Sequence, residues 1–124
     1  MNFESEGLGF ATADMIASLN AETHIVCRNS DACDEACRIL RERNNNAKVF
    51  GHVCDVSNMN QVRKFADSFL RDNQRLDVLV NNAGCMPATR TLTEEGNESI
   101  MATAIGGTLL LSHKLVPALE RLLL

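Results

Sequence analysis

Two glycines, Gly7 and Gly9, precede a helical pattern of apolar residues and offer the first candidate chemistry of the chain. Glycines at the start of a helix let backbone N–H groups approach a phosphate, which the helix N-terminus also attracts. An ordinary N-terminal loop also accommodates Gly-x-Gly, so a loop without a ligand stays open as the alternative.

Three further polar groups follow apolar runs that are typical of strands. Arg28 comes directly after Thr23–Cys27, Asp55 follows 48–53, and Asn81-Asn82-Ala83-Gly84 follows 76–80. A guanidinium such as that of Arg28 suits a phosphate group. The alternatives are a solvated cation at Arg28, a helix cap at Asp55 and a purely structural turn at 81–84.

The five cysteines of the chain are Cys27, Cys33, Cys37, Cys54 and Cys85, an odd number that does not suggest a secreted disulfide framework. Cys33 and Cys37 are spaced one helical turn apart, but no Cys-x-x-Cys motif or nearby pair of histidines completes a metal site. We therefore expect reduced thiols that pack as small apolar side chains, and no metal site.

The periodicity of the apolar residues predicts helices and strands in alternation. Helices are expected at 10–20, 30–43 and 58–71, and from 94 or 97 to the end with a kink at Pro117. Strands are expected at Thr23–Cys27, 48–53 and 76–80. Asn29 or Ser30 is expected to cap the second helix, and Ser57 the third.

Composition excludes several classes of protein. The 124 residues carry 12 basic and 16 acidic side chains, a formal net charge of −4, which does not suit nucleic acid or an anionic membrane surface. Met1 to Phe10 do not resemble a signal peptide, and apolar runs such as 109–111 are too short to span a membrane. We expect a soluble, cytoplasmic protein.

Helices that alternate with short apolar strands predict an α/β fold built from right-handed βαβ units around a parallel sheet. No linker or repeat divides the sequence, so residues 1–124 are expected to form one domain or part of one.

Three ordered segments together resemble the short-chain dehydrogenase/reductase family, which are NAD(P)-dependent oxidoreductases with a Rossmann fold. They are the run from Gly7 to Ala13, Cys54-Asp55-Val56, and Asn81-Asn82-Ala83-Gly84. The segments 24–29, 81–86 and 92–96 look most like the retinol-dehydrogenase-like branch. The resemblance extends from Ser5 to about Leu119.

The resemblance implies an NADP(H) site. Gly7, Leu8 and Gly9 would meet the pyrophosphate, and Arg28 with Asn29 would meet the adenosine ribose, where a guanidinium suits the 2′-phosphate of NADP. The turn at Asp55 and Val56 would contact the adenine. The implied residues after the third strand are Asn82, Ala83 and Gly84, on the ribose side together with Asn81.

The sequence departs from the family pattern at three places. Asn2 and Phe3 stand where the glycine-rich turn has Thr and its first Gly, and Ala104 stands where the long helix has an Asn. The family's catalytic Ser and Tyr-x-x-x-Lys are not found, since the chain contains no Tyr. Ser112, His113 and Lys114 are adjacent on a predicted helix, so their side chains diverge and do not replace these residues.

These departures imply a partial Rossmann domain, a three-layer α/β/α fold whose short sheet lacks the first strand and everything after the fourth. We expect a truncated dehydrogenase/reductase, related to enzymes that oxidise or reduce a retinoid, steroid or lipid-like alcohol or carbonyl but inactive alone. The alternative is a non-catalytic nucleotide-binding or interaction module whose open sheet edges pair with a full-length relative.

Overall fold

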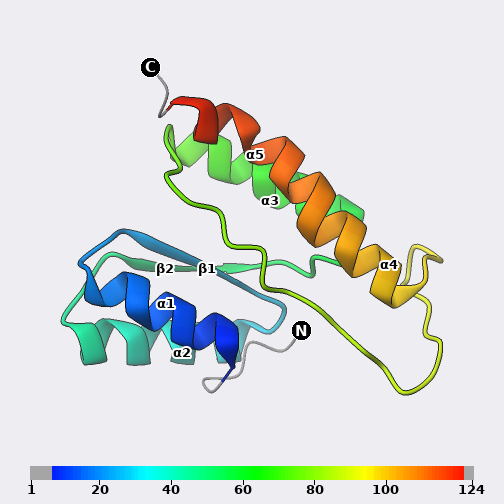
Figure 1. The fold of residues 1–124 in the computed structure, drawn as a ribbon, viewed down its shortest axis with the longest axis horizontal. Coiled ribbons are helices and arrows are strands. Elements are labelled where there is room, and N and C mark those ends of the chain that lie inside the picture. Colours follow the sequence, from blue (N-terminus) through cyan, green and yellow to red (C-terminus); the bar gives the residue numbers. More distant parts are fainter. Residues whose placement is uncertain (1–6, 122–124) are drawn as a thin grey trace. The chain divides into compact units, whose positions relative to one another are not determined.

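The computed structural model of the protein describes residues 7–121. The chain forms two compact units, within Met1–Cys54 and within Asp55–Leu124, named unit 1 and unit 2 here (Figure 1). Both are built around helices, and the described part of unit 1 also contains a sheet.

Unit 1 begins with helix α1 (Leu8–Ser18), followed by strand β1 (Thr23–Cys27). The helix starts two residues earlier than the predicted 10–20 and ends before Asn20, whose φ of 59° is left-handed. Asn tolerates this conformation better than most residues with a Cβ, so the turn into β1 is made there. The prediction for the strand is confirmed at both ends.

Helix α2 (Ser30–Asn44) connects β1 to strand β2 (Val49–Val53). Asn29 caps α2, because its side-chain oxygen accepts a hydrogen bond from the N–H of Ala32 at 2.9 Å. Asn45 ends the helix in a left-handed conformation with φ of 46°. Both predicted boundaries of the helix are confirmed to within one residue.

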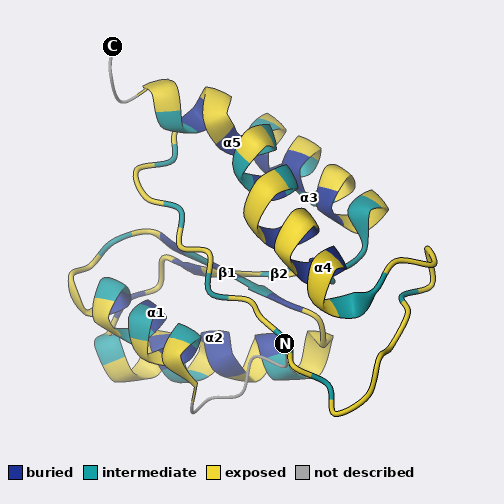
Figure 2. Cartoon of the chain, turned by 45° about the vertical axis from the view of Figure 1, so that its right-hand side comes forward, coloured by how far each residue is buried: buried dark blue, intermediate teal, exposed yellow. Residues whose placement is uncertain are grey.

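Strands β1 and β2 pair in parallel, with Thr23 opposite Val49 and Cys27 opposite Val53. Helices α1 and α2 pack on the sheet, and the buried residues of this unit lie between the helices and the strands (Figure 2). The core of unit 1 contains Phe10, Ala13, Ala17, Ile25, Cys27, Cys33, Ala36, Cys37, Leu40 and Val49.

A buried asparagine joins three segments of unit 1. The side-chain nitrogen of Asn46 donates to the carbonyls of Ala17 at 3.0 Å and Ala21 at 2.9 Å. Its side-chain oxygen accepts from the N–H of Lys48 at 2.9 Å. The end of α1, the approach to β1 and the approach to β2 are thus held by one side chain.

Unit 2 contains helix α3 (Met59–Asp72) and a helical stretch made of α4 (Ser99–Thr103), the π-helix η1 (Ala104–Leu110) and α5 (Leu111–Glu120). Asn58 caps α3 by accepting from the N–H of Gln61 at 3.0 Å, so the predicted Ser57 cap is wrong. The long helix begins at Ser99, after the side chain of Glu98 accepts from the N–H groups of Ile100 and Met101.

Helix α3 packs against η1 and α5 through buried residues of both partners. Those on α3 are Val62, Ala66 and Phe69, and those on α5 are Leu111, Leu115 and Ala118. By length and composition alone, the 22-residue stretch Ser99–Glu120 could also cross a membrane, with 33% of its most apolar window buried in the protein. The core helix of a soluble protein passes the same test.

The predicted third strand at 76–80 is wrong, because this segment lies in an irregular connection between α3 and α4. A strand needs a hydrogen-bonded neighbour, and the described residues include no strand ladder that involves this segment. The N–H of Leu76 instead donates to the carbonyl of Ala118 at 3.2 Å. The sheet of the described residues therefore has two strands, within an α/β fold as expected.

Candidate functional site

The first candidate group lies at the N-terminus of α1. Gly7 is the capping residue, with extended backbone angles (φ −94°, ψ 173°) and no side chain to occupy the helix end. Among residues 7–121, no atom lies within 4 Å of the position that a Cβ at Gly7 would take, so the described part of the chain leaves this space open. Leu8 is 83% exposed, and Gly9 belongs to the first turn of α1. The first N–H groups of a helix have no partner within it, which makes this end suitable for an anion.

Arg28 and Asn29 form the turn between β1 and α2. Figure 1 shows this turn at the same end of unit 1 as the start of α1, and both side chains are exposed. The oxygen of Asn29 is engaged as the cap of α2, which leaves its amide nitrogen for any further contact. The structure thus brings Gly7, Leu8, Gly9, Arg28 and Asn29 to one end of unit 1.

Asp55 organises the turn that opens unit 2. Its carboxylate oxygen Oδ1 accepts from the N–H of Ser57 at 2.9 Å and from the Ser57 hydroxyl at 2.7 Å. Its own N–H donates to the side chain of Gln61 at 2.8 Å. Asp55 therefore shapes the approach to α3, while the cap itself is Asn58.

Val56 is buried against η1, at a point where the helix backbone comes very close. A Cβ at Gly106 would stand 2.0 Å from the carbonyl oxygen of Val56, a distance that no side chain tolerates. A Cβ at Gly107 would meet the Val56 side chain at 3.3 Å. Gly106 is therefore what lets η1 support the turn at Asp55 and Val56.

Asn81 to Gly84 lie in the irregular connection of unit 2. Asn81 donates to the Ser112 hydroxyl at 3.0 Å, which ties the segment to α5. Asn82 is half-buried, whereas Ala83 and Gly84 are exposed, and a Cβ at Gly84 would meet nothing within 4 Å. The candidate residues thus fall into two groups, one in each unit.

The other side chains that could take part in a reaction, near His113 and at the cysteines, have structural contacts or are protonated thiols. Lys114 pairs with Asp67 at 2.7 Å, and Ser112 accepts from Asn81, so these neighbours of His113 serve separate contacts. Cys27, Cys33, Cys37 and Cys85 are free thiols. Burial raises the pKa of the Cys27 thiol and raises that of Cys37 to about 11, which keeps both protonated at neutral pH.

Sequence reasoning missed two features. Gly106 was not distinguished from other helical glycines, because the carbonyl it approaches lies 50 residues earlier in the chain, at Val56. Sequence reasoning also did not connect His24 with His52, whose rings the parallel strand pair brings together. Alternation along two adjacent strands was the only signal for the histidine pair.

The alternating helices and strands around a parallel strand pair are those of an α/β protein with a partial Rossmann fold. A family model described as short chain dehydrogenase matches residues 4–122. The chain therefore belongs to the short-chain dehydrogenase/reductase family, as the sequence predicted.

Similar curated proteins confirm the predicted resemblance to the retinol-dehydrogenase-like branch of the family. The chain is 37% identical over 117 residues to dehydrogenase/reductase SDR family member 12 of Homo sapiens, covering 94% of this chain and 37% of the relative. It is 32% identical over 114 residues to retinol dehydrogenase 11 of Mus musculus, covering 92% of this chain and 36% of the relative. The chain thus spans little more than a third of the length of these relatives.

Solved structures with a similar fold include two complexes with NADP. The Pseudomonas aeruginosa RhlG complex with NADP has a TM-score of 0.75 and 26% identity, covering 93% of this chain and 44% of that one. A metagenomic short-chain oxidoreductase in complex with NADP has a TM-score of 0.76 and 25% identity, covering 95% and 54%. The expected resemblance to NADP-binding proteins with a Rossmann fold is confirmed.

Proposed function

We propose that these 124 residues form part of the NADP(H)-binding domain of a short-chain dehydrogenase/reductase. The observation that carries the proposal is the pairing, at one end of unit 1, of an open helix N-terminus at Gly7 with the exposed Arg28. Similarity to two NADP complexes of the family supports it. The family reaction is hydride transfer between NADP(H) and an alcohol or carbonyl, here of a retinoid, steroid or lipid-like substrate.

Each group of residues has a defined task in this proposal. The N–H groups at Gly7, Leu8 and Gly9 hold the pyrophosphate, because the helix end carries partial positive charge. Arg28 and Asn29 hold the 2′-phosphate and ribose, since a guanidinium binds phosphate through two parallel hydrogen bonds. In unit 2, Asp55 and Val56 contact the adenine.

Within unit 2, the residues that follow segment 76–80 in the irregular connection have their own task in the proposal. Asn82, Ala83 and Gly84 line the ribose side of the cofactor, with Asn81 anchored to Ser112. The bound cofactor would supply the hydride, while the residues of this chain bind and orient it.

These 124 residues, in our proposal, do not catalyse hydride transfer by themselves. The family mechanism needs a Tyr phenol whose pKa a Lys lowers, and the chain has no Tyr. Ala104, where the family pattern has an Asn, has no side-chain group to orient a water or a Lys.

Exposed apolar residues in unit 2 favour a second function, in which the chain is an interaction module. Val78 is 68% exposed and Val80 is 49% exposed in a segment with strand-like composition. Such a segment can add to the sheet edge of another chain. A full-length relative is the proposed partner, and co-purification with such a relative would support this function.

The proposed location is the cytoplasm, as a soluble protein. The free thiols Cys27, Cys33, Cys37 and Cys85 support an intracellular, reducing environment. Fractionation of cells that express the chain would test this, since recovery in the membrane pellet would indicate that Ser99–Glu120 contacts lipid.

The test of cofactor binding is a calorimetric titration of the purified chain with NADPH and NADH, together with the variant Arg28→Ala. We expect saturable NADPH binding that weakens at least about tenfold in Arg28→Ala, because a charge-assisted contact to the 2′-phosphate is lost. NADH affinity should change little. Arg63→Ala, which removes an exposed guanidinium from α3, is the matched control. Equal affinity of Arg28→Ala and wild type for NADPH would refute the assignment of Arg28.

A further inference from the structure

Helix α1 has a second apolar face, in addition to the one that packs in unit 1. At about 3.6 residues per turn, Leu8, Met15 and Leu19 fall within an arc of about 40°. The buried Phe10 and Ala17 lie roughly opposite this arc, in the core of unit 1. The side chains of Leu8, Met15 and Leu19 are 83%, 69% and 77% exposed, and they are named the outer face of α1 here.

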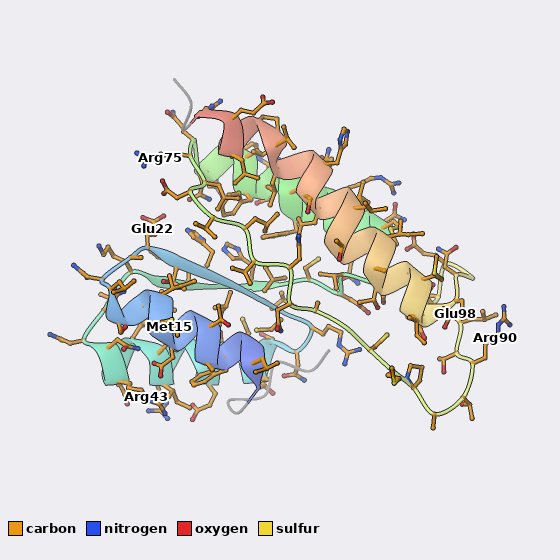
Figure 3. All side chains as sticks on the ribbon, viewed as in Figure 1. Met15, Glu22, Arg43, Arg75, Arg90 and Glu98 are labelled. Carbon is orange, nitrogen blue, oxygen red and sulfur yellow. The ribbon has the colours of Figure 1, made fainter. Side chains whose placement is uncertain are left out.

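The outer face of α1 carries no charge. Asp14 is the single charged residue of α1, and its carboxylate pairs with Arg43 of α2 at 3.0 Å, so it is turned toward α2. Figure 3 shows Met15 on α1 and Arg43 on the neighbouring α2. The exposed side of α2 is charged instead, and there Arg38 pairs with Glu35 at 2.7 Å. Water solvates such a charged side, whereas a helix that is apolar on all sides packs against protein all round.

The size of the outer face distinguishes the surfaces that could cover it. A large aliphatic side chain removes roughly 100 Å² from water when it is fully buried, so three of them bury on the order of 300 Å². A specific interface between separate proteins buries about 800 Å² on each partner. The outer face is therefore too small to hold a second copy of the chain by itself, and it suits a segment that packs on α1 within the same domain.

Proteins of this family are long enough to provide such a segment. The chain spans little more than a third of the length of its curated relatives, so most of each relative lies outside the matched part. In a fold of the Rossmann type, helices lie side by side on each face of the sheet. Helix α2 packs on one flank of α1, which leaves the flank with the outer face for a further helix.

We propose that the outer face of α1 is the docking face for an apolar helix of the remaining part of a short-chain dehydrogenase/reductase domain. The helix presents aliphatic side chains to Leu8, Met15 and Leu19, because an uncharged face offers nothing to compensate a buried polar group. The proposal rests on the function proposed above, in which these residues are part of such a domain. It extends that function by naming the surface through which the two parts join.

The experiment compares the 124-residue chain with a chimera in which these residues replace the matched part of human dehydrogenase/reductase SDR family member 12. We expect hydrogen peroxide to oxidise Met15 at least about tenfold more slowly in the chimera, since the docked helix covers its sulfur. In the 124-residue chain, Met86 is 92% exposed and gives the oxidation rate of an open side chain. Met15 should react at a rate close to that of Met86 there.

Met15→Gln and Leu19→Gln test the contact itself, while Leu8 is kept because it belongs to the proposed cofactor site. Each substitution should lower the Tm of the chimera by about 5 °C or more, because it places a polar group in a buried contact. The Tm of the 124-residue chain should stay within about 1 °C, since its outer face already meets water. Lys64→Gln, at an exposed position of α3, is the matched control and should change neither Tm.

Several results would overturn the docking face. Equal oxidation of Met15 in both proteins, or an unchanged Tm of the chimera in Met15→Gln, shows that no helix covers it. A chimera without a cooperative unfolding transition, where the human protein has one, shows that the two parts do not join. A dimer of the 124-residue chain that Met15→Gln dissociates assigns the face to a second copy instead.

Calorimetry with NADPH separates this proposal from the proposed function. A chimera that binds NADPH but whose Tm does not change in Met15→Gln keeps the cofactor assignment and removes the docking face. Protection of Met15 in a chimera that does not bind NADPH keeps the docking face and removes the cofactor assignment.

Discussion

In unit 1 two helices pack on a parallel strand pair, whereas in unit 2 helix α3 packs against the helical stretch Ser99–Glu120. Unit 1 satisfies the backbone groups of its connections with side chains, and Asn46 alone makes three such hydrogen bonds. Unit 2 instead brings backbone against backbone, where Gly106 meets the Val56 carbonyl.

The difference concerns what each unit tolerates. Removing a buried polar side chain lowers stability, because its partners lose their hydrogen bonds and water does not replace them. At a glycine in close backbone contact, adding a side chain lowers stability, because a packed interior has little room to relax around it. Unit 1 is therefore sensitive to truncation at Asn46, and unit 2 is sensitive to enlargement at Gly106.

The largest expected effect is in unit 1. Asn46→Ala should lower the free energy of unfolding by roughly 3 kcal/mol, at about 1 kcal/mol for each lost hydrogen bond. Urea unfolding followed by amide exchange in β1 and β2 measures this. Asn60→Ala on α3, where Asn60 is exposed, should change stability by less than about 0.5 kcal/mol. Similar losses in the two variants would show that Asn46 does not hold unit 1 together.

Enlargement in unit 2 should have a somewhat smaller net effect. Gly106→Ala adds a Cβ where the Val56 carbonyl stands, which should cost roughly 3 kcal/mol, offset by about 1 kcal/mol because Ala favours helix over Gly. Gly107→Ala is the matched control, since its Cβ meets only the Val56 side chain at 3.3 Å. Amide exchange of α3 and η1 would report the loss. An equal effect of both substitutions would contradict the importance of the backbone contact.

The smallest effect concerns acid stability. Hydrogen bonds from Asn44 and Arg43 hold the pKa of Asp14 below its usual value in the folded protein. A carboxyl with a depressed folded pKa stabilises above its unfolded pKa of about 3.9 and loses that contribution as pH falls through the folded value.

The corresponding variant is Asp14→Asn. Below about pH 4 its unit 1 should lose stability less steeply than wild type does, because Asp14 no longer titrates. Thermal unfolding from pH 6 to pH 2.5 measures the slopes. Asp34→Asn, at an exposed position of α2, serves as the control. Identical slopes for Asp14→Asn and wild type would show that Asp14 does not contribute to the loss of stability in acid.

Local sequence signals were sufficient for most of the fold. The apolar run Thr23–Cys27 and the cap at Asn29 depend on neighbours a few residues away, and both were predicted closely. Residues 76–80 have the same apolar character, yet a strand also needs a partner, which local composition does not provide. The cap of α3 moved from Ser57 to Asn58 because Asp55 engages the Ser57 hydroxyl.

The candidate site was predictable only where a motif is continuous in sequence. Gly7, Arg28, Asp55 and Gly84 were chosen from turns and a family resemblance, and their joint role in cofactor binding stays a prediction. The contacts of Gly106 with Val56 and of His24 with His52 arise from packing between distant segments. Periodicity shows the face on which a residue lies, but not which residue of another element it meets.

Gly51 has a consequence for the rate at which the thiols of unit 1 react. The position its Cβ would take lies 2.7 Å from the sulfur of Cys33 and 2.9 Å from that of Cys37. Two sulfur atoms thus occupy the space that a side chain at Gly51 would take. An alkylating reagent reaches these sulfurs only when α2 separates from β2. The rate at which these cysteines are labelled therefore reports how often unit 1 opens.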